Sequence, residues 1–252
     1  MKENSMQFLL EACVDTVESA IEAKKGGANR LELCSNLLVG GTSPSLALYE
    51  LVKATTAMRV HVLIRPRSGD FCYTDYEFQV MKREIEIFKH AGAEGVVIGI
   101  LQADGTLDIE RMQELIATAS GMHITLHRAF DVAEDPYQAL ENSKALGVDT
   151  ILTSGQKNHC IDGVSLIQEL VERSEKRVDI MVGSGVNADN IDKLIRITGA
   201  HTFHLSGKKR YDSPMTYRKE GVTMGVNQID EYACWLTDSE KIHKVYMHLK
   251  KA

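Results

Sequence analysis

A Glu-x-Cys pattern occurs twice near the start of the chain, each time at the end of an apolar run. Glu11 and Cys13 end the first run, and Glu32 and Cys34 end the second. If both runs are β-strands, alternate side chains share a face, so each glutamate points to the same side as its cysteine. Neighbouring parallel strands would then place two thiols and two carboxylates side by side. This cluster suits either binding of a soft metal ion or acid–base chemistry in an active site.

Two arginines flank a proline at the end of the third apolar run, as Arg65-Pro66-Arg67. Proline fixes the backbone between two planar guanidinium groups, which bind carboxylate or phosphate through paired hydrogen bonds. We predict that Arg65 and Arg67 bind an anion in a ligand site that also includes Glu11. The alternative is a structural charge network in which Arg30, Arg65, Arg67 or Arg128 pairs with the carboxylates of Glu11 and Glu32.

A histidine and an aspartate lie four residues apart in the segment His127–Asp131. The pair could be a general base with the carboxylate that orients it, or a metal ligand with its supporting carboxylate. Arg128, between them, is a further candidate for anion binding. The plain alternative is an inward-facing histidine that only makes a hydrogen bond.

Small and polar residues end or follow the last three predicted strands. Glycine-containing loops expose backbone N–H groups, and the loops after strands seven and eight of a barrel often bind phosphate. The candidate ligand-binding residues in these segments are Thr153, Ser154, Gly183, Gly185, His204 and Ser206.

Strand-like and helix-like segments alternate along the chain, and this alternation must position the residues above. The predicted strands are 8–13, 30–34, 59–65, 95–100, 123–127, 149–153, 178–182 and 201–205. The predicted helices are 15–25, 44–55, 76–90, 108–120, 136–146, 161–173, 187–197 and 239–249, with a polar loop before the last one.

Strict alternation requires parallel strands joined by right-handed crossovers. Eight such units in a chain of 252 residues favour an α/β fold with a single TIM-type (β/α)8 barrel, and an open doubly wound sheet is the second choice. We predict one domain over residues 1–252, with its core at about 7–250. In a barrel of this type, sites lie at the carboxyl ends of the strands, and the candidate residues gather there.

The composition limits the classes of partner. Hydrophobic residues make up 44% of the chain and charged residues 25%, with a net charge of −6, as in a soluble globular protein. No basic cluster with interleaved aromatics occurs, so we expect no nucleic-acid partner. No apolar run reaches the about 20 residues that span a bilayer, and the first residues do not resemble a signal peptide. The five cysteines form no CxxC pair, so we expect reduced thiols and a cytoplasmic location.

Several of these stretches, in order along the chain, resemble the CutC family of copper homeostasis proteins. They are residues 10–15 (LEACVD), 26–34 (GGANRLELC), 40–45 (GGTSPS), 64–71 (IRPRSGDF), 127–131 (HRAFD), 152–155 (LTSG) and 214–218 (PMTYR). The resemblance implies a single (β/α)8 barrel, a cytoplasmic and often oligomeric protein, and handling of copper as Cu(I). The proposed copper ligands of the family match Cys13 and Cys34, and thiolates suit Cu(I). The family usually has a glutamate two residues before His204, where this chain has Thr202.

Two functions therefore remain open at the level of the sequence. The first is a copper homeostasis protein that binds Cu(I) through Cys13 and Cys34. The second is a lyase or isomerase that acts on a phosphorylated or carboxylated small molecule. In that enzyme, Glu32 or His127 would move a proton with support from Asp131.

Overall fold

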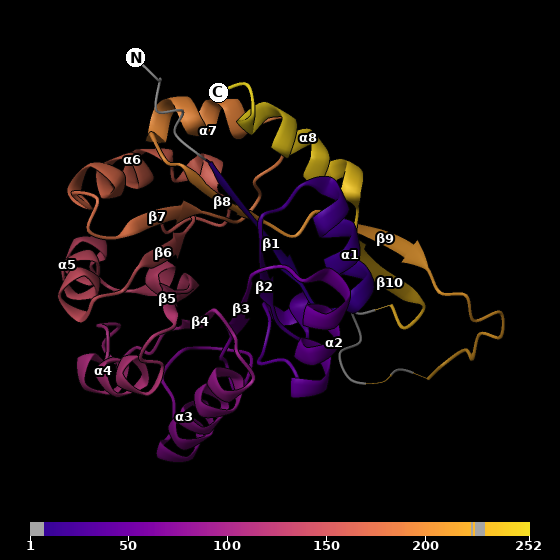
Figure 1. Ribbon diagram of the computed structural model, residues 1–252, viewed down its shortest axis with the longest axis horizontal. Helices are drawn as coiled ribbons and strands as arrows, with labels where there is room; N and C mark the ends of the chain where they lie inside the picture. Colours follow the sequence, from indigo (N-terminus) through magenta and orange to yellow (C-terminus); the bar gives the residue numbers. More distant parts are fainter. Residues whose placement is uncertain (1–7, 223, 225–229) are drawn as a thin grey trace.

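The computed structural model of the chain describes residues 8–222, 224 and 230–252. Eight parallel strands close into a barrel, in which each strand pairs with the next and β8 pairs with β1. A ring of helices surrounds the barrel (Figure 1), which confirms the predicted (β/α)8 architecture. The strands are β1 Leu9–Val14, β2 Arg30–Leu33, β3 Val60–Leu63, β4 Gly95–Ile98, β5 His123–Leu126, β6 Thr150–Thr153, β7 Asp179–Val182 and β8 Thr202–Leu205.

A helix follows each barrel strand, and short 3-10 helices extend three of the loops. The helices are α1 Val17–Gly26, α2 Leu46–Thr56, α3 Asp75–His90, α4 Ile109–Thr118, α5 Pro136–Leu146, α6 Val164–Arg173, α7 Ile191–Thr198 and α8 Ser239–Leu249. The 3-10 helices are η1 Leu37–Val39, η2 Arg128–Val132 and η3 Cys160–Asp162. The predicted early start of α7 was wrong. Asn187 and Asn190 instead form a hydrogen-bonded turn ahead of this helix.

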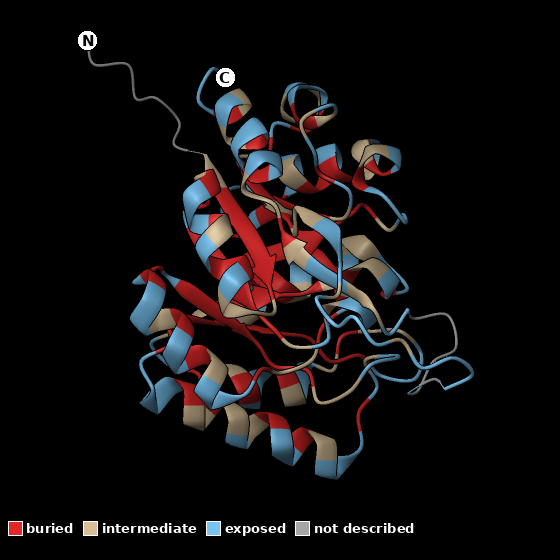
Figure 2. Cartoon of the chain, turned by 90° about the vertical axis from the view of Figure 1, so that its right-hand side faces the viewer, coloured by how far each residue is buried: buried red, intermediate tan, exposed pale blue. Residues whose placement is uncertain are grey.

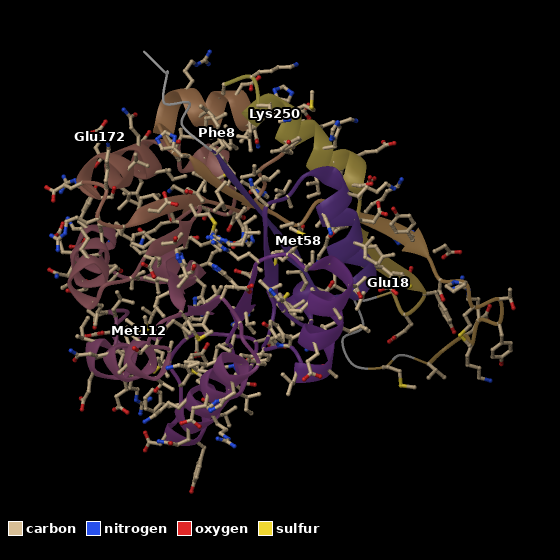
Figure 3. All side chains as sticks on the ribbon, in the orientation of Figure 1. Phe8, Glu18, Met58, Met112, Glu172 and Lys250 are labelled. Atoms are coloured by element: carbon tan, nitrogen blue, oxygen red, sulfur yellow. The ribbon has the colours of Figure 1, made fainter. Side chains whose placement is uncertain are left out.

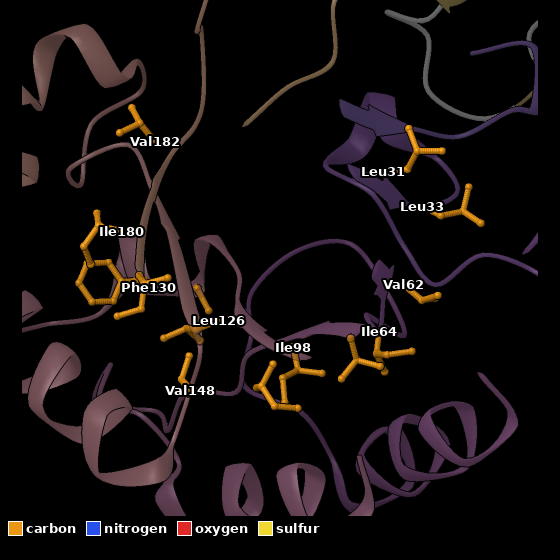
Figure 4. Packing of buried hydrophobic residues seen from close by; sticks show 14 of the residues in the cluster. Leu31, Leu33, Val62, Ile64, Ile98, Leu126, Phe130, Val148, Ile180 and Val182 are labelled. Atoms are coloured by element: carbon orange, nitrogen blue, oxygen red, sulfur yellow. The ribbon is translucent and has the colours of Figure 1, made fainter. Parts of the chain in front are cut away.

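The main hydrophobic core lies between the strands and the helices. Alternate residues of the strands, such as Leu31, Leu33 and Val62, and Ile64 directly after β3, point outward into this layer (Figure 4). The strands and the inner faces of the helices are buried, and the outer helix faces are exposed (Figure 2). Because strand side chains alternate, the residues between these apolar positions face the barrel interior, where the polar candidates lie.

The outer surface of the helix ring carries charged side chains, with Glu18 and Glu172 among those labelled at the periphery in Figure 3. Among the described residues, no helix is both long enough and apolar enough to cross a membrane.

The segment after β8 differs from the polar loop that the sequence predicted. It contains two antiparallel strands, β9 Lys208–Asp212 and β10 Ala233–Thr237. The hairpin projects from the barrel beside α1 (Figure 1). The residues of β9 are charged or aromatic and mostly exposed, so this strand has no apolar–polar alternation from which it could be recognised.

Candidate functional site

The strand register brings the two Glu-x-Cys segments together at the carboxyl ends of β1 and β2. Cys13 lies opposite Glu32 across this strand pair. The two sulfur atoms of Cys13 and Cys34 are 3.8 Å apart, and both side chains are buried. The predicted cluster is therefore present as a thiol pair.

Each thiol of the pair has its own acceptor. The Cys13 thiol donates a hydrogen bond to Oε1 of Glu32 at 3.1 Å. The Cys34 thiol donates to the carbonyl oxygen of Val14 at 3.6 Å. The hydrogen bond with Cys34, burial, and the nearby charges of Cys34 and Glu32 raise the pKa of the Cys13 thiol well above its usual range. The Cys13 thiol therefore keeps its proton at neutral pH.

The second carboxylate, Glu11, belongs to a buried ion cluster below the thiols. Its oxygens accept hydrogen bonds from Nε of Arg30 at 2.5 Å and pair with Nδ1 of His204 at 2.8 Å. Burial opposes the charge, but Arg30 and His204 hold the pKa of Glu11 well below its usual range. The expected pairing of Glu11 with an arginine is confirmed.

Glu32 behaves differently from Glu11. Within the described residues it forms no ion pair with an arginine, so the expectation of such a pairing was wrong for this residue. Burial and the neighbouring charge of Glu11 raise the pKa of Glu32. Its second oxygen, Oε2, is buried and has no hydrogen-bond partner in the described part of the chain.

Three side chains from different strands could share one metal ion. Single donor atoms of Cys13, Glu32 and His204 all lie within 4.8 Å of one another. Cys34 is adjacent to this group through its contact with the Cys13 sulfur. The site thus offers two sulfur donors, one carboxylate and one imidazole.

A cavity of about 720 Å³ opens above this cluster at the carboxyl ends of the strands. Cys13, Glu32 and His204 line it. Cys34 is fully buried and packs behind Cys13 among Leu37, Leu63 and Val97. The cavity therefore reaches the thiol pair from the Cys13 side.

His127 also lines the cavity, but among the described residues the predicted hydrogen bond between His127 and Asp131 is not present. Nδ1 of His127 instead accepts a hydrogen bond from the backbone N–H of Ala129 at 3.1 Å. Burial, together with the charge of Arg65, lowers the pKa of His127 to about 3. The ring packs over Gly99, where an added Cβ would lie 2.6 Å from the imidazole Cε1. His127 is thus held neutral in one orientation, by contacts different from those predicted.

Asp131 organises the loop after β6 instead. It accepts hydrogen bonds from the Thr153 hydroxyl at 2.6 Å and from the backbone N–H of Ser154 at 3.0 Å. It also pairs with Nε of Arg128 at 2.7 Å. Thr153 and Ser154 are consequently tied to Asp131, while Arg128 reaches the cavity lining.

The two arginines of the Arg-Pro-Arg segment are separated by the fold. Arg65 lines the cavity, is 6% exposed, and donates hydrogen bonds to the carbonyl oxygens of Gly41 and Gly69 at 2.9 and 2.7 Å. Arg67 pairs with Glu77 at 2.6 Å and with Asp70 at 3.0 Å and does not line the cavity. Of these two arginines, the structure therefore brings Arg65 to the candidate site and leaves Arg67 outside it.

The last strands place further predicted residues on the opposite wall. Gly185 and Ser206 line the cavity, whereas Gly183 packs against Leu152. Thr202, further down β8, bonds through its hydroxyl to Asp179.

Three lysines of the cavity lining escaped the sequence reasoning. They are Lys208, Lys241 and Lys244. Lys241 and Lys244 lie one turn apart on α8, but no sequence pattern shows that this face of α8 borders the barrel mouth.

Comparison with known proteins places this architecture in a family. The model of the CutC family matches residues 8–209. The chain belongs to the CutC family. A mouse relative named copper homeostasis protein cutC homolog is 42% identical over 93% of this chain and 87% of its own length. A CutC family protein of Parabacteroides distasonis is 44% identical over 96% of this chain and 100% of its own.

Solved structures agree with this CutC assignment. A crystal structure titled as a CutC protein of Streptococcus agalactiae matches with a TM-score of 0.75 and 32% identity, over 79% of this chain and 99% of that one. A thiamine phosphate pyrophosphorylase of Pyrococcus furiosus matches with a TM-score of 0.58 and 14% identity, over 98% of this chain and 97% of that one. The second likeness concerns the barrel fold alone.

Proposed function

We propose that this CutC-family chain acts in copper homeostasis by binding Cu(I) through Cys13 and Cys34. The observation that carries the proposal is the buried thiol pair, whose sulfurs lie 3.8 Å apart at the floor of an open cavity. Thiolates are soft ligands that select Cu(I) over hard cations. The relatives named for copper homeostasis support the same metal.

The separation of the sulfur atoms fits one shared ion. Two thiolates that each lie about 2.3 Å from a metal, as in zinc–thiolate sites, can be at most about 4.6 Å apart. A separation of 3.8 Å corresponds to a bent arrangement of the two sulfurs, which leaves room for a further donor. Glu32 and His204 are the side chains within reach for that role.

The test compares two double variants under oxygen-free conditions. Cys13→Ser/Cys34→Ser should lose stoichiometric Cu(I) binding in a titration against a competing chelator, because serine cannot supply a thiolate. Cys72→Ser/Cys234→Ser removes the same number of thiols from exposed positions and should bind like the parent. Equal Cu(I) affinity of the first variant and the parent, with both folded by circular dichroism, would contradict the proposal.

We also infer a cytoplasmic location, because all five cysteines are free and reduced thiols persist in that compartment. Cell fractionation tests this inference, and recovery of the protein outside the cytoplasm would overturn it.

We further infer that the chain forms a homo-oligomer. The hairpin β9–β10 and the segment that joins its strands carry exposed Tyr211, Met215, Tyr217 and Trp235, and exposed apolar clusters often mark interfaces. Light scattering should give a mass above that of one chain, and Tyr217→Glu should reduce it. A monomeric parent would contradict the inference.

A further inference from the structure

We propose that the cavity beside the thiol pair binds a phosphorylated small organic molecule, with its phosphate at the β7 and β8 loops and its polar organic part at Arg65, His127 and Glu32. This ligand goes beyond copper, which needs only the cluster at the floor. The cavity of about 720 Å³ is far larger than an ion requires and lies in the range of small-molecule sites.

The first argument is a set of buried polar atoms without partners. Nε of Arg65, Nε2 of His127 and Oε2 of Glu32 are buried and have no hydrogen-bond partner among the described residues. All three side chains are less than one-tenth exposed and line the same cavity. Buried polar groups are nearly always paired, so three unpaired ones around one cavity point to an absent partner molecule.

The roles of these atoms define what they would bind. Nδ1 of His127 accepts a hydrogen bond from Ala129, so the proton of the neutral ring lies on Nε2, which is then a donor. Nε of Arg65 is also a donor, and Oε2 of Glu32 is an acceptor when ionised and a possible donor when protonated. Two donors and one such carboxyl oxygen match the hydroxyl groups of a polyol, each of which can both accept and donate a hydrogen bond.

The second argument is the charge of the opposite wall. Lys208, Lys241 and Lys244 line the cavity beside the loop after β8. Lys241 donates to the carbonyl oxygen of Lys208 at 2.6 Å. In the described part of the chain, the ammonium groups of Lys208 and Lys244 have no ion-pair partner. Asp189 is the carboxylate on this wall, so positive charge is in excess and favours a dianion such as phosphate.

Backbone donors accompany these lysines. Ser184, Gly185 and Gly207 line the cavity. Within the described residues, their N–H groups make no hydrogen bond to the protein. Gly185 has a φ of +87°, a left-handed conformation that glycine adopts without strain and that turns the loop along the cavity. Free backbone N–H groups beside lysines are a common arrangement for phosphate.

The first experiment measures binding by calorimetry on the copper-free full chain. The probes are ribose 5-phosphate, ribose and inorganic phosphate. We expect ribose 5-phosphate to bind more tightly than either ribose or phosphate alone. Lys208→Ala/Lys244→Ala should weaken binding of ribose 5-phosphate by at least about tenfold, because each lysine can make a charge-assisted hydrogen bond. The matched control, Lys193→Ala/Lys219→Ala, removes two exposed lysines outside the cavity and should leave affinity unchanged.

The second experiment separates the two ends of the site. His127→Gln should weaken ribose 5-phosphate severalfold and leave inorganic phosphate unaffected, because only the organic part reaches this residue. Lys208→Ala/Lys244→Ala should bind Cu(I) like the parent, because neither lysine belongs to the thiol cluster, so loss of this site and loss of copper binding are distinguishable. The proposal is overturned if ribose 5-phosphate binds no better than ribose, or if Lys208→Ala/Lys244→Ala binds as tightly as the parent.

Discussion

At the scale of single residues, the Cys13 thiol has two neighbours that oppose its ionisation. Its hydrogen bond with Cys34, its burial and the charges of Cys34 and Glu32 all raise its pKa. A metal that binds Cys13 must displace this proton, so Cu(I) binding at the proposed site should depend on pH. Affinity should rise by up to about tenfold per pH unit for each proton released.

Glu32→Gln should make the Cys13 thiol more acidic. The substitution keeps the shape of the side chain but removes the negative charge 3.1 Å from the sulfur, and a nearby like charge disfavours the thiolate. A titration by ultraviolet thiolate absorbance, with Cys13→Ser as the blank, should show a lower pKa. An equal or higher pKa in Glu32→Gln would contradict this interpretation.

Residue types alone identified the thiol pair because Glu-x-Cys fixes which side chains share a face of a strand. They did not predict that Glu11 and Glu32 would have opposite environments. That difference depends on the strand register, which sets Glu11 beside Arg30 and His204 and sets Glu32 beside Cys13. The residue pattern of neither segment predicts this strand register.

At the scale of elements, η2 and the loop after β6 are joined by one carboxylate. Asp131 accepts hydrogen bonds from Thr153, Ser154 and Arg128, and its side chain is 4% exposed. The sequence suggested a pairing with His127 because the two residues are four positions apart. The 3-10 turn of η2 instead directs the carboxylate towards β6, which spacing could not reveal.

Asp131→Asn should destabilise the protein by about 2–3 kcal/mol, because it removes the charge from several buried hydrogen bonds and leaves at least one donor unpaired. Equilibrium unfolding in urea measures this change. Asp104→Asn is the control and should change stability little, because Asp104 lies at an exposed turn where its side-chain hydrogen bonds within the described chain go to Thr106. Equal stability of the two variants would show that the Asp131 contacts contribute little to folding.

The barrel strands were predictable because outward-facing and inward-facing residues alternate along each strand, and the outward-facing residues are apolar and pack into a buried layer. The β9–β10 hairpin was not, because its strands pack on the outside of the barrel, where β9 exposes charged side chains and β10 exposes Cys234 and Trp235. The lysines of the cavity wall were missed for a related reason. Their position depends on how α8 packs beside the barrel mouth, which is a property of the tertiary fold.

At the scale of the whole molecule, buried neutral histidines tie stability to pH. Burial, with the charge of Arg30, lowers the pKa of His61 to about 3, and burial with Arg65 does the same for His127. The unfolded chain takes up protons at these histidines near pH 6.5, while the folded chain does not until about pH 3. Their contribution to stability is therefore complete above about pH 6.5 and is lost as the pH falls towards 3.

His127→Gln should flatten this dependence. Between pH 7 and pH 5, His127 should cost the parent about 2 kcal/mol of unfolding free energy. The total loss of unfolding free energy over this range should therefore be smaller in the variant by about 2 kcal/mol. Urea unfolding at pH 7 and pH 5 gives the change in unfolding free energy for the parent and for the variant. Because each protein is compared with itself, a change in the absolute stability of the variant does not affect the comparison. A loss in His127→Gln as large as in the parent would show that this histidine titrates normally.

The position of Cys34 behind Cys13 has a consequence for how Cu(I) would leave the proposed site. Only Cys13 borders the cavity, so an acceptor thiol can approach a bound ion from one direction alone. Ligand exchange would then follow a fixed order, in which the acceptor replaces Cys13 before the bond to Cys34 breaks. Such an ordered handover would keep the ion attached to at least one sulfur throughout and would prevent its release as a free ion.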